Sequence, residues 1–244
     1  MEIIYEDEQI LVCRKEAGLP VQSGRVQTMD LVSMLKNHLR EKQRDGMEPY
    51  LGIVHRLDQP VEGLLVFAKT KKAAASLSAQ VQDGRMEKSY LAAAVISGRN
   101  LPDEGVLENW LVRDTKTNRS RIVEKKEAGA KSARLEYRIL QRRRLTEGAG
   151  ETALVQIHLF TGRHHQIRVQ MAGAGMPLVG DRKYGQPELQ EYGRAEGKAG
   201  VTEKKEKISL ALCAWSLSFL HPSTGRQMEF QCEPEGEAFQ PFTA

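Results

Sequence analysis

The chain has 244 residues, of which 40% are hydrophobic and 28% are charged, and its formal net charge is +4. This composition is typical of a globular protein with a substantial core and excludes wholesale disorder. No apolar run approaches the roughly 18 residues that a membrane span needs, and the acidic N-terminus lacks the basic segment of a signal peptide, so we expect a cytoplasmic protein.

Three cysteines, Cys13, Cys213 and Cys232, are widely spaced and form no CxxC pair. A sparse, odd set argues against a disulfide framework and against a zinc site built on thiolates. Each lies in an apolar or strand-like stretch, so we expect three buried structural cysteines.

Arginine residues concentrate in three stretches, 113–121, 142–144 and 163–168, with acidic segments between them. A basic face on a nearly balanced protein suits a phosphate backbone. Solvated surface explains these arginines equally well, so charge alone leaves RNA binding open.

The first part of the chain combines short strands with two helices. Residues 28–40 have the apolar spacing of a helix capped by Thr28, and Thr70 is expected to cap a second helix that ends near Gly84. Predicted strands occupy residues 3–5, 10–13, 50–54 and 64–68.

The second part is dominated by strands, with one short helix at residues 166–174, a hairpin connection at 221–225 and a mobile polar loop at 186–207. Predicted strands or apolar segments occupy residues 88–96, 105–113, 121–124, 133–139, 152–159, 210–220 and 227–232. Many strands with few helices between them predict an α+β fold, with a mixed, mostly antiparallel central sheet and flanking helices and loops. We expect a single domain over residues 1–244.

Residues 55–70, HRLDQPVEGLLVFAKT, place Asp58 shortly before an apolar run that we expect to be a buried strand. A strand end is rigid and can hold a carboxylate in a fixed position. Taken alone, Asp58 is better explained as a turn residue, because Asp-x-Pro is ordinary turn composition.

The motifs of several other chemistries are missing from the sequence. It contains no GxSxG elbow, Walker loop or GxGxxG, and the spacing of His158, His164 and His165 fits no metal motif. We therefore expect neither a metal nor a nucleotide cofactor.

An aspartate, a tyrosine and two arginines remain: Asp58, Tyr90, Arg163 and Arg168. A carboxylate in a dry pocket stays ionised only beside a fixed cation, and arginine can fork onto it. A tyrosine can stack on a base and offer its hydroxyl. Considered separately, Tyr90 is better explained as a core aromatic and Arg168 as surface charge.

Three ordered motifs combine these residues: HRLDQPVEGLLVFAKT at 55–70, EKSYLA at 87–92 and TGRHHQIRV at 161–169. They resemble the catalytic motif, the Lys-x-Tyr-x-Ala segment and the Thr-Gly-Arg-x-His-Gln-Ile-Arg-Val motif of the RluA family of pseudouridine synthases. Residues 179–185 and 217–222 are similar to further blocks of that family in the same order. The resemblance therefore covers nearly the whole chain.

The resemblance implies a pseudouridine synthase fold and the isomerisation of uridine in RNA without a cofactor. It also implies that Asp58 is the catalytic aspartate, Tyr90 the aromatic that stacks on uracil, and Arg168 the ion-pair partner of Asp58. Covalent attack by Asp58 and action on the sugar C2′ proton both remain open. The residues expected to bind the flipped-out substrate are His55, Arg56, Arg163, His165 and Gln166.

Two departures from the family pattern lie close to Asp58. Val61 and Glu62 stand where Thr-Ser is usual, so Glu62 adds a second carboxylate near Asp58. A catalytically inactive RNA-binding protein that keeps the fold is therefore the alternative interpretation. We expect a monomer without an S4-type domain before its first strand, and an RNA partner, ribosomal RNA being preferred over transfer RNA.

Overall fold

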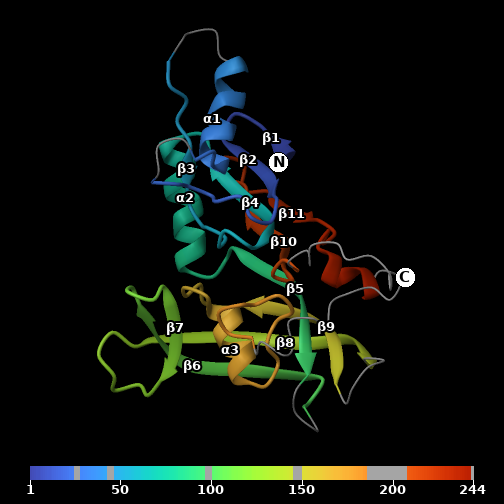
Figure 1. Ribbon diagram of the computed structural model, residues 1–244. Helices are drawn as coiled ribbons and strands as arrows, with labels where there is room; N and C mark the ends of the chain where they lie inside the picture. Colours follow the sequence, from blue (N-terminus) through green and yellow to red (C-terminus); the bar gives the residue numbers. More distant parts are fainter. Residues whose placement is uncertain (25–27, 43–46, 97–100, 145–149, 186–207, 243–244) are drawn as a thin grey trace. The chain divides into compact units, whose positions relative to one another are not determined.

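The computed structural model describes residues 1–24, 28–42, 47–96, 101–144, 150–185 and 208–242 (Figure 1). The loop expected at residues 186–207 lies outside them. The chain divides into two compact units, the first formed by Met1–Lys88 with Cys213–Glu233 and the second by Ser89–Leu212 with Pro234–Ala244. The single catalytic domain expected from the sequence stays a prediction.

The first unit is built around a strand that is buried along its whole length. This strand, β4 (Glu62–Ala68), pairs with β2 (Ile10–Lys15) on one side and β10 (Leu212–Leu220) on the other. Short strands extend the sheet: β1 (Glu2–Glu6) pairs with β2, β3 (Gly52–Ile53) with β4, and β11 (Gln227–Gln231) with β10. Residues on both faces of β4 are buried. Its sequence is therefore a nearly continuous apolar run and shows no alternation.

Two helices, α1 (Leu31–Lys42) and α2 (Lys71–Gln82), belong to the same unit (Figure 1). The Thr70 side chain accepts a hydrogen bond from Ala73 N at 3.1 Å, which confirms the predicted cap of α2. The cap predicted at Thr28 is wrong. Asp30 performs that role, because its carboxylate accepts from Ser33 N at 2.8 Å and satisfies an N–H of the first helical turn.

The second unit contains five strands in the order β5 (Glu87–Ile96), β9 (Glu151–Leu159), β8 (Lys131–Arg144), β6 (Glu104–Asp114) and β7 (Arg119–Val123). All these neighbours are antiparallel, and the alternation predicted for residues 133–139 is confirmed by the burial pattern of β8. The helix α3 (Gln166–Gly173) lies against this sheet, with Val169 packed among Leu111 and Ala133. A short 3₁₀ helix, η2 (Glu237–Phe242), follows near the C-terminus.

The predicted fold class is confirmed: the chain is α+β, with mostly antiparallel strands and few helices. Within the described part of each unit, β4 with β10 is the parallel pair. The strand predicted at residues 50–54 is shorter than expected, because only Gly52–Ile53 pairs with β4. Among the described residues, no helix is both long and apolar enough to cross a membrane.

The cysteines are all free thiols. Cys13 and Cys213 are buried as expected, and burial raises the pKa of Cys13 to about 12. Cys232 is only partly buried, so the prediction of burial is wrong for this residue. Its Sγ lies 3.9 Å from Cys213 Sγ, a proximity that their separation in the sequence does not indicate.

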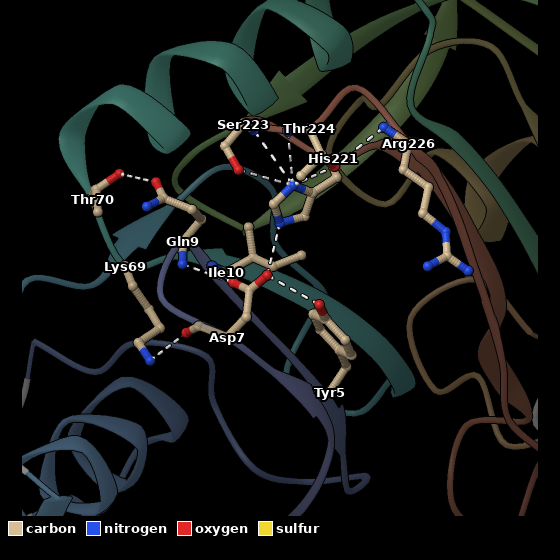
Figure 2. Close-up of polar contacts among 10 residues, drawn as sticks. All are labelled: Tyr5, Asp7, Gln9, Ile10, Lys69, Thr70, His221, Ser223, Thr224 and Arg226. Atoms are coloured by element: carbon tan, nitrogen blue, oxygen red, sulfur yellow. Dashed lines mark hydrogen bonds and ion pairs between the residues drawn. The ribbon is translucent and has the colours of Figure 1, made fainter.

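An aspartate in the β1–β2 turn fastens that turn to the β10–β11 hairpin (Figure 2). One oxygen of Asp7 accepts from Ile10 N at 2.8 Å, and the other accepts from the Tyr5 hydroxyl at 3.0 Å and contacts His221 Nε2 at 2.8 Å. His221 Nδ1 in turn accepts from Ser223 N at 3.4 Å and lies 3.2 Å from the Ser223 hydroxyl. Asp7, His221 and Ser223 thus form an Asp-His-Ser series. Because backbone N–H groups donate to His221 Nδ1, this series caps the β10–β11 hairpin.

The neighbouring carboxylate, Glu6, is the ionic centre of the first unit. It contacts His38 Nε2 at 2.8 Å and Lys42 Nζ at 2.7 Å, both on α1, and Lys69 Nζ at 2.9 Å. Burial alone would raise the pKa of Glu6, but hydrogen bonds from these three partners prevail and lower it to about 2. The ionised carboxylate therefore holds α1 against β1 and the end of β4.

Glu6→Gln is expected to lower the free energy of unfolding by about 1–3 kcal/mol at pH 7. Because the folded pKa is depressed, the stabilisation is complete above the unfolded value near 4.5 and is lost as the pH falls towards 2. Urea unfolding at several pH values should therefore show the two proteins converging in acid. Glu48→Gln, which removes an exposed pair with Lys36, should change stability little, and a constant difference between Glu6→Gln and the unmodified protein down to pH 2 would contradict the assignment.

Candidate active site

The Asp58 turn lies between β3 and β4 in the first unit. Val61 N donates to Asp58 O at 3.0 Å and closes the turn. Gly18 N donates to Gln59 O at 2.9 Å, and Gln59 Nε2 donates back to Gly18 O at 2.9 Å. These reciprocal bonds fasten the turn directly after Asp58 to the loop that follows β2.

A buried lysine lies behind this turn. Lys15, the last residue of β2, is fully buried, and its Nζ donates to Glu16 O at 2.9 Å, Leu19 O at 2.8 Å and Gln59 O at 2.9 Å. Three carbonyls match the three donors of an ammonium group. One cation thus ties the end of β2 and its loop to the Asp58 turn.

The charge on Lys15 also matters for the site. Burial lowers the pKa of Lys15 to about 8, and the negative charges of Asp58 and Glu62 oppose that shift. The side chain therefore remains mostly protonated at neutral pH.

Lys15 was not among the predicted site residues, although its position on the strand indicates an unusual environment. Alternation along β2 places Lys15 on the same face as the buried residues Leu11 and Cys13. A lysine on an apolar strand face must find acceptors for its ammonium group, which marks it as a structural or functional residue.

The second carboxylate near Asp58 is paired. Glu62 is buried at the start of β4, and Arg14 Nη2 lies 3.3 Å from its Oε2. Arg14 and Lys15 are consecutive, so the end of β2 places one cation on Glu62 and a second on the backbone of the Asp58 turn. Glu62 therefore does not leave an uncompensated charge beneath the Asp58 turn.

The second residue of β4, Gly63, must be a glycine. Its φ is +117°, and a Cβ at this position would lie 2.4 Å from the Ala214 carbonyl oxygen. Strands β4 and β10 approach each other too closely here for any side chain, and only glycine adopts this φ readily.

Two of the residues predicted to bind substrate precede Asp58. His55 Nε2 accepts from Val66 N at 3.1 Å, and burial, with the charge of Lys88, lowers the pKa of His55 to about 3. His55 is therefore a neutral acceptor that supports β4. Arg56 is exposed beside it. Substrate binding by either residue stays a prediction.

The remaining predicted site residues belong to the second unit. Tyr90 is buried in β5 opposite Ile157 of β9, and Arg168 is buried in the first turn of α3. Arg168 Nε and Nη2 donate to the two carboxylate oxygens of Asp181 at 2.8 and 2.6 Å. Asp181 lies in the block 179–185, for which the sequence predicted no site residue. The pairing of Arg168 with Asp58 stays a prediction.

The loop before α3 is held together by its own side chains. Gln166 Oε1 accepts from the Thr161 hydroxyl at 2.8 Å and from Arg163 N at 3.0 Å, and its Nε2 donates to Arg134 O at 3.1 Å. Arg163 Nε donates to Ser132 O at 2.8 Å. Gln166, predicted to bind substrate, therefore has a structural part in shaping this loop.

His165, also predicted to bind substrate, is the residue before α3 and has a left-handed backbone with φ +53°. Its Nδ1 lies 2.8 Å from the Tyr184 hydroxyl. Burial is the main cause that lowers the pKa of His165 to about 3, and the nearby charge of Arg168 adds to it. The ring is therefore neutral, and its contacts with Tyr184 and the stacked His164 ring help to hold the left-handed backbone.

No group of three or more His, Cys, Asp or Glu side chains that could hold a metal ion occurs within the described ranges. The expectation that the chain acts without a metal stays a prediction.

Comparison with known proteins connects this geometry to a family. The family model described as RNA pseudouridylate synthase matches residues 9–173. A protein from Aquifex aeolicus named "Uncharacterized RNA pseudouridine synthase" is 35% identical over 98% of this chain and 71% of its own length. The "Dual-specificity RNA pseudouridine synthase RluA" of Yersinia pestis is 33% identical over 96% of this chain and all of its own length.

Other relatives are longer. The "Ribosomal large subunit pseudouridine synthase D" of Neisseria meningitidis serogroup B is 35% identical over 95% of this chain, which spans 57% of that protein. Among solved structures, that of "Human RNA Pseudouridylate Synthase Domain Containing 4" is 23% identical with a TM-score of 0.73, covering 98% of this chain and 92% of that one. The structural likeness shows the fold. With the matched family model and the relatives above 30% identity, it follows that the chain belongs to the RNA pseudouridylate synthase family, as an RluA/RluD-type member, and is thus an isomerase.

Proposed function

We propose that this chain converts uridine to pseudouridine in structured RNA, with Asp58 as the catalytic aspartate. Membership of the family supports the reaction. The observation that carries the assignment of Asp58 is its turn, which hydrogen bonds tie to the loop after β2 and to the buried ammonium of Lys15. Such a turn presents a carboxylate at a fixed position before a rigid strand.

The reaction rearranges bonds within one nucleotide. The N1–C1′ bond breaks, the uracil turns, C5 bonds to C1′, and the proton on C5 leaves while N1 gains one. Asp58 either attacks C1′ or acts on the C2′ proton, and both roles need an ionised carboxylate.

The other roles rest on side chains of the second unit. Tyr90 is proposed to stack on the uracil and Arg168 to pair with Asp58, with Arg163 contacting the substrate nearby. Arg56 is exposed and is proposed to hold the uridine in its flipped-out position, at a cost of a few kcal/mol in duplex RNA. His55, His165 and Gln166 would shape the site through their internal hydrogen bonds.

Ribosomal RNA is the proposed target. Relatives from several bacteria carry names of ribosomal large subunit pseudouridine synthases, and one relative is named as a dual-specificity enzyme. We propose that the chain acts in the cytoplasm as a monomer, without a metal or nucleotide cofactor. The alternative of an inactive RNA-binding protein loses its main support, because Glu62 is paired with Arg14.

The first test uses RNA labelled with tritium at uridine C5. The unmodified protein should release tritium, and Asp58→Asn should reduce release by at least about a thousandfold while leaving the fold intact, because the amide is isosteric but cannot serve as nucleophile or base. The measurement is single-turnover tritium release from total ribosomal RNA and, separately, from transfer RNA. Faster release from ribosomal RNA is expected.

Asp83→Asn is the matched control, because Asp83 is an exposed aspartate of the same unit that pairs with Arg85. It should release tritium at the unmodified rate. Unchanged release by Asp58→Asn would refute the assignment of Asp58, and binding without release by the unmodified protein would favour the inactive alternative.

Lys15→Met should destabilise the protein by about 2–5 kcal/mol, because the three carbonyls that converge on the buried ammonium lose their donor. It should also slow tritium release from folded protein, since the Asp58 turn loses one of its attachments. Urea unfolding and single-turnover release at 15 °C would measure both effects. Lys36→Met removes a more exposed lysine of the same unit and should alter neither; a Lys15→Met variant as stable as the unmodified protein would exclude the proposed attachment.

A further inference from the structure

Asp181 is a buried carboxylate for which the proposed mechanism has no role. It is 1% exposed and lies in the segment after α3. Its Oδ1 accepts from Lys183 N at 2.9 Å and from Tyr184 N at 3.1 Å. These backbone donors fix the orientation of the carboxylate independently of any other side chain.

The Asp181 carboxylate accepts two hydrogen bonds from one edge of the Arg168 guanidinium group. Arg168 Nε donates to Asp181 Oδ2 at 2.8 Å, and Arg168 Nη2 donates to Oδ1 at 2.6 Å. Two parallel hydrogen bonds define the plane of the guanidinium as well as its position. Both side chains are almost fully buried, so solvent weakens this pair little.

Tyr184 holds the same group from its face. The centre of the Arg168 guanidinium lies 5.2 Å from the centroid of the Tyr184 ring. The Tyr184 hydroxyl accepts from Ser120 N at 2.7 Å and contacts His165 Nδ1 at 2.8 Å, which ties the ring to β7 and to the start of α3. The guanidinium is thus held at an edge and on a face.

The backbone around Asp181 is adapted to this role. Gly185 N donates to Asp181 O at 2.8 Å, and a Cβ at Gly185 would lie 2.5 Å from that oxygen. Gly180 has φ +74°, and a Cβ there would lie 2.2 Å from Ser209 O. Glycine on both sides lets the segment fold tightly enough to bring its carboxylate to Arg168.

We propose that Asp181 is a positioning residue for the isomerisation: it fixes the plane and position of the Arg168 guanidinium. This inference rests on the proposed function, in which Arg168 pairs with Asp58. Asp181 itself does not touch the substrate. Its effect is expected in the chemical step, because a displacement of about 1 Å in a catalytic group can cost a hundredfold in rate.

The test compares kcat and KM for tritium release by Asp181→Asn and Asp181→Glu, each expressed per folded molecule from circular dichroism. Asp181→Asn should lower kcat between about tenfold and a hundredfold and leave KM within about threefold. Asp181→Glu keeps the charge and two acceptor oxygens, so it should recover part of the lost kcat. A merely structural role would reduce the folded fraction and leave kcat per folded molecule unchanged.

Asp103→Asn is the matched control, because Asp103 forms an exposed pair with Arg142 in the same unit through the same guanidinium atoms, Nε and Nη2. It should behave as the unmodified protein. If Asp181→Asn does not fold, the kcat of Asp181→Glu decides, because the longer side chain displaces the carboxylate that holds Arg168. A kcat equal to that of the unmodified protein in whichever variant folds would overturn the inference.

Tritium release by the unmodified protein, Asp58→Asn and the Asp181 variants separates this inference from the proposed function. An unmodified protein that releases no tritium would overturn the proposed function. An active unmodified protein and an inactive Asp58→Asn, together with full kcat in the Asp181 variants, would overturn the role of Asp181 alone.

Discussion

The ammonium group of Lys15 is the constraint on which the first unit depends most. It is fully buried, and it is tolerable there because three carbonyls from separate positions converge on it. Those carbonyls belong to the end of β2, the loop after it and the Asp58 turn. A local requirement, the solvation of one buried charge, therefore fixes the path of two loops that are distant in sequence.

The same solution recurs for the other buried charges. Glu62 is accompanied by Arg14, and Arg168 by Asp181. Buried ion pairs contribute little net stability, because desolvation offsets their attraction, but an unpaired member would be costly. Their value lies in specificity of position: each pair allows its groups one arrangement. A site that must hold a carboxylate and a guanidinium in register benefits from such pairs more than from additional apolar packing.

Local features of the sequence predicted much of the fold. The continuous apolar run of β4, the alternation in β8 and the Thr70 cap were readable, because each depends on neighbouring residues. The cap at Asp30 was misassigned to Thr28, since either side chain can accept the N–H bond and only the folded backbone selects between them. The parallel pairing of β4 with β10 was not predictable, because alternation reveals which face is buried but not which strand lies alongside. For the same reason Asp181 appeared only as part of a motif: its significance is a contact with Arg168.

The division of the first unit between the two ends of the chain has a consequence for biosynthesis. Residues 1–88 contain the Asp58 turn and β4, yet β10, which pairs with β4 at Gly63, is translated only after the whole of residues 89–211. Until β10 emerges from the ribosome, the edge of β4 at Gly63 has no partner and its apolar residues are uncovered. A chain that stopped before β10 would therefore leave this edge of β4 open to pairing with other chains.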